Sequence, residues 1–416
     1  MDKLWVVIKR EYLERVRSKW FIFTTIFGPV FFGAITILPS YMTMKGMKNA
    51  QVSSIRILDA TGEYPFTGDV LVQGNRIKQI TKGSSRFGSS SSSYSGATVI
   101  DGMGATLMPG MIDAHLHLSW NNAPGIDPIQ MMELEEHMLV TMEMAKLVLD
   151  AGFTAGRGAA AAKPRLDVVA KRFINEGRFP GPRYLAAGPE ITTVGGLGDA
   201  APSHIPHPGL NLGLVVSGPE EIRRTVRTLI KYGVDSIKLN LSGESLTGMG
   251  AEETPMAEDE VAMAASEARC RNKVLSAHAR SSGSVKQCVR HGIQNIYHAS
   301  FADEEALDML EAVKDRHFVA PGIAWLINTA RHAEQWGIKP GSPLSMQYER
   351  ELEMCVETMK KMHRRGIRIC IGGDYGLPGR RKAPTPKTSR PSSRCWASRR
   401  WKRSRPRPNT AARSWV

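Results

Sequence analysis

The sequence is poor in cysteine and lacks the paired spacing that cysteine adopts in small zinc modules. Its 416 residues include five cysteines, and no two of them form a CxxC pair. A disulfide scaffold and a thiolate zinc module are therefore excluded. Hydrophobic residues make up 42% of the chain and charged residues 23%, which excludes a collagen-like or wholly disordered protein. The length fits one large α/β barrel with a small companion domain.

The last part of the chain, residues 377–416, lacks acidic residues altogether. It contains 13 Lys and Arg, six Pro, and no aliphatic residue beyond alanine except Leu377 and Val416. Such a segment cannot bury a core, and we predict a basic disordered tail. A functional basic tail is one interpretation. We prefer a shifted reading frame or a chimeric gene, because GC-rich DNA read out of frame encodes this mixture of Arg, Pro, Ser and Ala.

The net charge of +15 belongs to the two ends of the chain. Residues 51–376 contain 34 Lys and Arg against 37 Asp and Glu, so the central body is slightly acidic. No nucleic-acid-binding fold or interleaving of basic and aromatic residues accompanies the basic ends. We therefore expect a small-molecule substrate and no specific nucleic-acid partner.

One long hydrophobic run is present near the N-terminus. Residues 20–42 are 23 consecutive uncharged residues, long enough to span a bilayer core. Basic residues precede the run, so the N-terminus should stay cytoplasmic. The stretch KREYLERVRSKWFIFTTIFGPVF resembles the start of ABC-2-type transporter permeases over residues 1–45. We expect one membrane-anchoring helix; the alternatives are a buried core helix, or a fusion artefact on a cytoplasmic enzyme.

Two folded regions are predicted between the ends. Residues 52–105 hold short alternating segments separated by glycine turns, which predicts antiparallel strands of a small, partial β-sandwich domain. Between them, residues 84–95 contain eight serines and read as a surface loop. From residue 106 to 376, short apolar strands alternate with helical stretches, which predicts a (β/α)8 barrel of the TIM type. The strands are expected at 111–117, 153–156, 183–187, 236–240, 274–278, 295–298, 318–321 and 368–373. Helices are expected near 129–150, 165–176, 219–232, 258–271, 282–291, 303–314 and 344–365, with shorter helical fragments between them.

The sharpest chemical signal is the run LMPGMIDAHLH at residues 107–117. Side chains alternate along a strand, so His115 and His117 point to the same side and make half of a metal site. The run resembles the opening motif of the amidohydrolase superfamily. Within it, the body resembles the imidazolonepropionase-related and prolidase-like group, which has a β-sandwich beside a metal barrel.

The resemblance implies a complete set of ligands. Lys238, His278, His298 and Asp374 stand in the expected order at predicted strand ends. His115, His117 and Asp374 would hold one divalent metal ion, His278 and His298 a second, and Lys238 would bridge both as a carbamate. Zinc is the metal implied. A surface role for Lys238 and hydrogen-bonded structural roles for the histidines are the alternatives.

The implied chemistry is hydrolysis of an amide or related C–N bond. Asp374 would take the proton from the attacking water and pass it to the leaving nitrogen. Dipeptides are the implied substrates, and ureas or carbamates are an alternative within the same chemistry. A non-enzymatic, membrane-anchored fragment of a chimeric gene is the alternative from another class.

Substrate contacts are predicted at residues beside the ligands. Arg280 lies two residues beyond His278 and could bind a carboxylate in a bidentate manner, or could form a salt bridge within the barrel. Asn240, Tyr297 and Tyr375 are further candidates. The loop 192–209 could form a substrate lid, with His204 and His207 as exposed loop residues.

Two features depart from the pattern of the resembled group. Arg157 is followed by Gly158, where that group usually has Asp. After the eighth strand, the basic tail replaces the last helix and the closing strands of the sandwich. We therefore expect a fold truncated at the C-terminus, with open strand edges, poor solubility and doubtful activity.

Overall fold

The computed structural model describes residues 49–83, 97–204 and 211–376. The chain divides into two compact units, Met1–Pro109 and Gly110–Val416. The predicted membrane span at 20–42, the serine-rich loop at 84–95 and the basic tail at 377–416 lie outside the described residues. Within the ranges described, no helix has both the length and the hydropathy required to cross a membrane.

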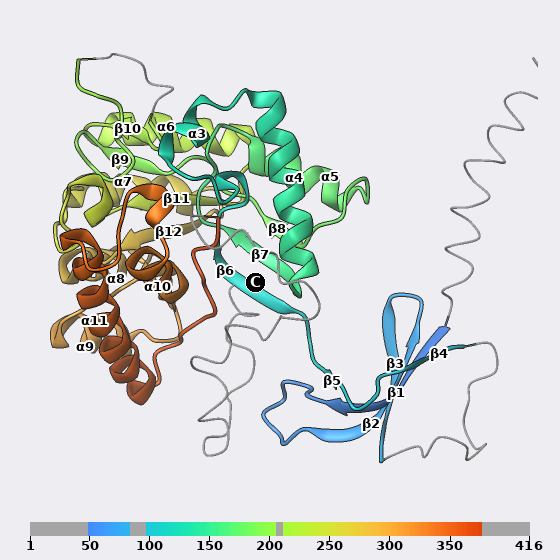
Figure 1. The fold of residues 1–416 in the computed structure, drawn as a ribbon. Helices are drawn as coiled ribbons and strands as arrows, with labels where there is room; N and C mark the ends of the chain where they lie inside the picture. The colour runs from blue at the N-terminus through green and yellow to red at the C-terminus, as the bar shows by residue number, and fades with distance from the viewer. Residues whose placement is uncertain (1–48, 84–96, 205–210, 377–416) are drawn as a thin grey trace, which may run out of the picture. The chain divides into compact units, whose positions relative to one another are not determined.

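The first unit contains a single five-stranded sheet (Figure 1). Its strands are β1 (Asn49–Ile57), β2 (Phe66–Gln73), β3 (Arg76–Lys82), β4 (Thr98–Asp101) and β5 (Thr106–Leu107). The sheet order is β3-β2-β1-β4. The short strand β5 pairs with the C-terminal end of β1, on residues that follow those paired with β4. Gly74, with a φ of 59°, opens the two-residue connection between β2 and β3, where glycine is favoured.

The prediction of antiparallel strands in this unit is partly wrong. The β1–β2 and β2–β3 pairs are antiparallel, but β4 and β5 both pair with β1 in parallel. Parallel pairing needs a long connection, which the residues between β3 and β4 supply. The strand pattern alone does not encode this direction.

The second unit is a closed barrel of parallel strands. Its strands are β6 (Met111–Leu116), β7 (Phe153–Gly158), β8 (Arg183–Leu185), β11 (Ser236–Asn240), β12 (Val274–Ala279), β13 (Asn295–His298) and β14 (Phe318–Ala320). The segment 368–375 completes the ring, because Ile369 bridges to Val319 of β14 and Tyr375 bridges to Leu116 of β6. A third bridge, between Ala187 and Ser236, joins β8 to β11. All eight predicted strand positions therefore take part in parallel pairing.

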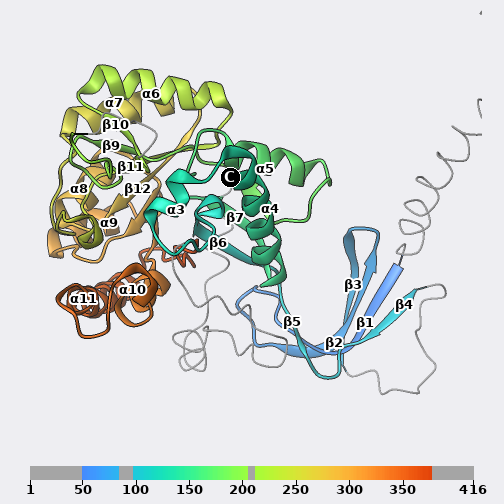
Figure 2. The same cartoon turned by 45° about the horizontal axis from the view of Figure 1, so that its top comes forward.

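Helices cover the outside of this barrel (Figures 1 and 2). They are α3 (Ile126–Met131), α4 (Leu134–Asp150), α5 (Leu166–Asn175), α6 (Pro219–Tyr232), α7 (Glu258–Arg269), α8 (Ser282–His291), α9 (Glu304–Ala312), α10 (Ile323–Arg331) and α11 (Pro343–Arg365). In α6, Ile222, Val226 and Leu229 recur at helical spacing and are fully buried against the strands. Pro219 begins this helix and Gly233, in a left-handed conformation, ends it.

Several elements differ from those predicted. The helix expected at 129–150 is two helices, α3 and α4, and α10 lies where only helical fragments without bounds were expected. Two short parallel strands, β9 (Ile191–Thr193) and β10 (Leu214–Val216), extend the sheet beside β11. The strand β9 overlaps the start of the predicted lid loop at 192–209, and β10 follows the loop in the chain. Each has three residues, too few to show an alternating pattern in the sequence.

The barrel interior is filled by small side chains and a few large ones. A buried cluster inside the ring consists of Ala114, Ala159, Tyr297, Phe318, Ala320 and Cys370. Polar side chains lie toward the carboxyl ends of the strands, where barrels of this kind carry their chemistry. The predicted ligands occupy this end.

Candidate metal centre

His115 and His117 lie near the carboxyl end of β6, and both side chains are almost completely buried. His117 Nδ1 lies 3.1 Å from the carbonyl oxygen of Ala160, which can only accept a hydrogen bond. This contact places the proton of a neutral His117 on Nδ1 and leaves the lone pair on Nε2. Trp120 stacks on the His117 ring at a centroid distance of 3.5 Å and fixes its plane.

Asp374 lies against both histidines. One carboxylate oxygen, Oδ1, is 3.1 Å from Nε2 of His115 and 3.1 Å from Nε2 of His117. The backbone amide of Asp374 donates to the carbonyl of His115, which anchors the closing segment on β6. Asp374 has a φ of 58°, an uncommon conformation for a residue other than glycine. The chain thus holds a strained backbone at the point where this carboxylate meets the two imidazoles.

Burial and proximity shift the pKa values of these groups. Burial lowers the pKa of His115 to about 4, so this ring is neutral at pH 7 and can offer a lone pair. Burial alone would raise the pKa of Asp374, but the adjacent His115 and His117 lower it well below its ordinary value. The carboxylate is therefore ionised at neutral pH.

The donor set fits a metal ion. Among the described residues, His115, His117 and Asp374 form a group whose potential ligand atoms all lie within 4.8 Å of one another. Two ligand atoms on a tetrahedral zinc ion with bonds of about 2.1 Å lie roughly 3.4 Å apart, close to the 3.1 Å found here. A neutral His117 also directs the lone pair of Nε2 at Oδ1 of Asp374, and an ionised carboxylate oxygen can only accept. A cation between these two atoms would stabilise this arrangement.

His278 and His298 form a second buried pair at the ends of β12 and β13. Their ring centroids are 4.4 Å apart, and the His298 ring is 5.0 Å from that of His115. Burial lowers the pKa of both rings well below the usual value, so both are neutral. Nδ1 of His298 is buried without a hydrogen-bond partner among the described residues, as expected of an atom that serves as a ligand.

Lys238 lies on β11 and is 2% exposed. Its Nζ is 3.6 Å from a carboxylate oxygen of Glu190 and 5.3 Å from the centroid of the Tyr297 ring. Burial lowers the pKa of Lys238, although Glu190 opposes this shift. The surface role considered for Lys238 is therefore wrong, and the shift favours the neutral amine that carbamate formation requires.

The residues predicted to contact substrate have different surroundings. Arg280 is fully buried, and its guanidinium bonds to Glu244 and to Glu351, which is the salt bridge within the barrel considered as the alternative. Asn240 donates from Nδ2 to the carbonyl of Leu197 at 2.8 Å, in the segment that follows β9.

The two predicted tyrosines differ in exposure. The ring of Tyr297 is completely buried and stacks on His115 at 3.9 Å, so it supports a ligand. Tyr375 is 37% exposed and lies next to Asp374 in the closing segment. Of these two side chains, Tyr375 is the one accessible to a molecule from solvent.

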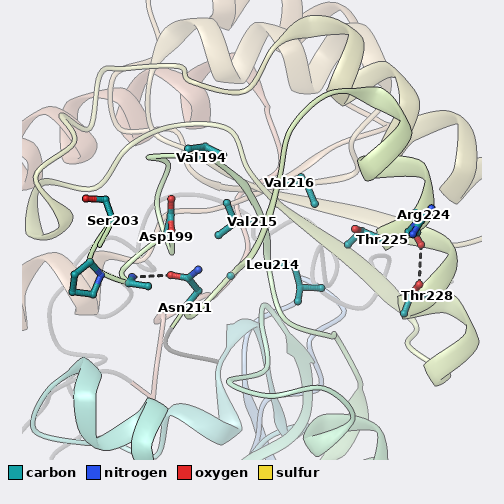
Figure 3. A pocket seen from close by; sticks show the side chains of 13 residues that line it. Val194, Asp199, Ser203, Asn211, Leu214, Val215, Val216, Arg224, Thr225 and Thr228 are labelled. Atoms are coloured by element: carbon teal, nitrogen blue, oxygen red, sulfur yellow. Dashed lines mark hydrogen bonds between the residues drawn. The ribbon is translucent and has the colours of Figure 1, made fainter. Parts of the chain in front are cut away.

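A cavity of about 700 Å³ lies beside β10 and α6. Figure 3 shows the side chains that line it. It is lined by Val194, Asp199, Ala201, Pro202, Ser203, Asn211, Gly213, Leu214, Val215, Val216, Arg224, Thr225 and Thr228. The lining does not include the six predicted ligands. His204 directly follows the lining residue Ser203 in the chain and is exposed, as predicted. His207 lies outside the described residues.

Four residues at the site were missed by sequence reasoning: Glu190, Glu244, Tyr348 and Glu351. Glu244 and Glu351 lie 36 and 71 residues from Arg280 in the chain, and Tyr348 belongs to α11. No local motif marks them, because their partners come from distant elements. The one available sequence signal was the position of Glu351 on the apolar face of the predicted helix 344–365.

The sequence of residues 106–384 matches the model of the amidohydrolase family. The chain belongs to the amidohydrolase family. This match does not include residues 1–45, on which the permease resemblance rests, and that resemblance remains a prediction. Ochratoxinase of Aspergillus niger is 27% identical over 232 residues, which cover 49% of this chain and 45% of the ochratoxinase. This amidohydrolase thus spans about half the length of the curated relatives it matches.

Solved structures share the fold of this amidohydrolase. A prolidase complexed with N-methylphosphonate-L-proline has a TM-score of 0.68 and 24% identity, with 80% of this chain and 79% of that chain covered. A Xaa-Pro dipeptidase with methionine bound in the active site has a TM-score of 0.67 and 23% identity, with 80% of each chain covered. At these identities the likeness establishes the fold alone.

Proposed function

We propose that this amidohydrolase is a metal-dependent hydrolase that cleaves amide or related C–N bonds of small molecules. The observation that carries the proposal is the approach of one Asp374 oxygen to Nε2 of both His115 and His117, at 3.1 Å each. His115, His117 and Asp374 would hold a divalent cation, which would lower the pKa of a bound water and polarise a carbonyl. Imidazole and carboxylate donors suit zinc.

Asp374 is the residue that we assign to proton transfer. Its carboxylate is ionised and buried, with 6% of the side chain exposed. It lies beside the histidines, and no lysine or arginine of the described residues bonds to it. A carboxylate in this position can accept a proton from the attacking water and donate it to the leaving nitrogen. Its anchored backbone keeps the acceptor oxygen in place during this transfer.

A second cation would be held by His278 and His298, with Lys238 between the two positions. Lys238 as an ammonium cannot bind a metal, since it has no lone pair. The lowered pKa of this buried amine favours the reaction with carbon dioxide that would give it two carboxylate oxygens. The ring of Tyr297 contacts both groups: it stacks on His115, and Lys238 Nζ lies 5.3 Å from its centroid.

A substitution at Gly322 tests whether the His298 ring is a metal ligand. A Cβ at Gly322 would lie 2.9 Å from Nδ1 of His298 and 3.1 Å from its Cε1, and the φ of Gly322 is 65°. We expect Gly322→Ala to displace the ring and to weaken binding of the second zinc ion about tenfold, in line with losses at other supporting residues. Zinc titration of the chelator-treated protein measures this.

Gly337→Ala is the matched control for that variant. Gly337 has a φ of 78°, and its added Cβ would meet no atom within 4 Å. Both variants carry the same left-handed strain of about 1–2 kcal/mol, but only the first reaches the histidine. Equal zinc affinities in the two variants would contradict the role of His298.

Dipeptides are the first substrate class that we propose, with support from the prolidase and the Xaa-Pro dipeptidase that share this fold. Of the side chains predicted to contact substrate, Tyr375 remains the candidate, because Asn240 and Tyr297 are buried. Arg280, the predicted anchor for a substrate carboxylate, is already bonded to two glutamates. This favours a second candidate class of substrates, which is neutral amides, ureas and carbamates.

A panel of substrates separates the two classes. Xaa-Pro dipeptides, N-acyl amino acids, aryl ureas and aryl carbamates are incubated with the zinc-loaded chain, and product is measured by mass spectrometry. We expect hydrolysis of at least one C–N class that chelation abolishes. A preference for neutral members would assign the second class, and no metal-dependent turnover of any member would contradict the proposed function.

We further propose that residues 20–42 anchor the enzyme in a membrane with the N-terminus cytoplasmic. The uncharged length of this run and the basic residues before it support the proposal. Partition of the full chain into lipid vesicles, compared with a chain carrying Ile26→Lys and Phe32→Lys, tests it. Equal partition of both chains would contradict an anchor and favour a fused segment on a cytoplasmic enzyme.

A further inference from the structure

The segment 194–199, which follows β9, lies against a buried ion pair at the predicted metal centre. A Cβ at Gly198 would be 2.8 Å from Oε1 of Glu190. The other carboxylate oxygen of Glu190 is 3.6 Å from Nζ of Lys238. Because Gly198 has no side chain, the backbone can approach this pair closely. The segment therefore covers the site on the side of Lys238.

One hydrogen bond ties this segment to the end of β11. Nδ2 of Asn240 donates to the carbonyl of Leu197 at 2.8 Å, and a carbonyl can only accept, which fixes the orientation of the amide. Asn240 lies two residues beyond Lys238 on the same strand, so both side chains point to the same side of β11. The bond thus links the segment to the part of the barrel that carries a predicted ligand.

This arrangement buries polar atoms that have no partner. Oδ1 of Asn240 and Oγ1 of Thr192 are both buried without a hydrogen bond among the described residues. A Cβ at Gly196 would be 2.5 Å from Oγ1 of Thr192, so the segment packs directly on this hydroxyl. Buried polar atoms without partners destabilise the state that buries them. Movement of the segment would let water reach both atoms, which offsets the loss of the bond to Leu197.

A cavity lies on the outer side of the segment. The cavity of about 700 Å³ is lined in part by Val194 and Asp199 of the segment and by Arg224 of α6, which covers the outside of the barrel (Figure 3). The segment therefore has space to move away from β11. Gly195 and Gly198, with φ of 71° and 96°, are the positions at which its backbone can change direction with little strain.

We propose that residues 194–199 form a lid over the metal centre and that Asn240 is the latch that holds this lid closed. The lid is closed while Asn240 binds the carbonyl of Leu197. It opens into the cavity and gives a small molecule a path to the site beside Lys238. Asn240 is thus a positioning residue, in place of the substrate contact predicted for it. The role of the lid in access rests on the metal site of the proposed function.

Hydrogen exchange of backbone amides, measured by mass spectrometry on the full chain, tests the latch. Asn240→Asp keeps the unpartnered oxygen and replaces the donor with a second acceptor, which repels the carbonyl of Leu197. We expect amides at 195–199 to exchange at least about fivefold faster, the factor that corresponds to a hydrogen bond of about 1 kcal/mol. The amides of β11 and β12 should exchange as in the wild type. Unchanged exchange at 195–199, or an equal increase throughout the barrel, would overturn the latch.

Gly198→Ala is the second variant, leaves the latch itself intact, and decides the matter if Asn240→Asp does not fold. Its Cβ would lie 2.8 Å from Oε1 of Glu190 and 3.2 Å from the backbone nitrogen of Gly213, so we expect it to push the lid open. Gly248→Ala is the matched control, because Gly248 has a φ of 83° and its Cβ would meet no atom within 4 Å. Exchange in the lid that is equally slow in both variants would contradict the proposal.

The rates of zinc loading and of zinc release to excess chelator test the control of access. A lid changes entry and exit by the same factor, so we expect both rates to rise at least about fivefold in the two lid variants with zinc affinity unchanged. Faster release with unchanged loading would indicate a weakened ligand and overturn the role in access. A wild type that binds no zinc would overturn the proposed function, while hydrogen exchange would still decide whether Asn240 is a latch.

Discussion

Replacing Asp374 by Asn is expected to reduce the rate of hydrolysis by about 10³-fold, within the range found for loss of a general base. Asparagine keeps the shape of the side chain but cannot accept the proton from water. It also removes the charge whose oxygen lies 3.1 Å from both His115 and His117, so zinc affinity should fall as well. Rates at saturating zinc separate the loss of proton transfer from the loss of metal.

Asp150→Asn is the control for this substitution. Asp150 is more than half exposed and pairs with Lys146 one turn away on α4, so the same chemical change there should leave the rate unchanged. The assignment of Asp374 would be wrong if Asp374→Asn folded, bound zinc and retained a rate within a few-fold of the wild type.

Replacing Lys238 by Ala is expected to lower zinc affinity by more than about 100-fold, because loss of a shared ligand should exceed the loss seen for supporting residues. Lys238 is buried within 3.6 Å of Glu190, and its lowered pKa favours the free amine. Intact-protein mass spectrometry under native conditions should show the wild type heavier by one bound carbon dioxide. Zinc loading should also be faster in bicarbonate than in carbon-dioxide-free buffer.

Lys273→Ala is the control for that experiment. Lys273 is partly buried at the opposite end of the barrel strands, where its Nζ donates to the carbonyl of Val234. It should change neither the bound carbon dioxide nor the response to bicarbonate. The carbamate would be excluded if bicarbonate did not change the rate of zinc loading in the wild type and no mass were added at Lys238. The site would then hold a single metal ion.

The barrel strands were predictable because each has an apolar run of the right length between helical patterns. The closing segment is the informative case: residues 368–375 pair with β14 and β6 through isolated bridges, yet their sequence marks a strand. Buried positions of a parallel sheet are apolar on both faces, and this pattern survives even where pairing is sparse. The strands β9 and β10 were missed because elements of three residues carry no clear period.

The metal-binding histidines were predictable for a different reason. His115 and His117 are two apart on one strand, so local geometry alone brings them together. Asp374 was predictable only through the family motif. The partners of Arg280 could not be predicted, since Glu244 and Glu351 reach it from separate elements and a salt bridge within the barrel was as good an interpretation as a substrate contact.

The most direct test is zinc content and hydrolysis measured together on the full chain after chelation. We predict that hydrolysis of a C–N substrate disappears with the metal and returns as zinc is added, reaching its maximum at two ions per chain in the wild type. Asp374→Asn should stay inactive throughout. A chain that unfolds cooperatively but binds no divalent ion, or hydrolysis that survives complete removal of metal, would contradict a metal-dependent hydrolase.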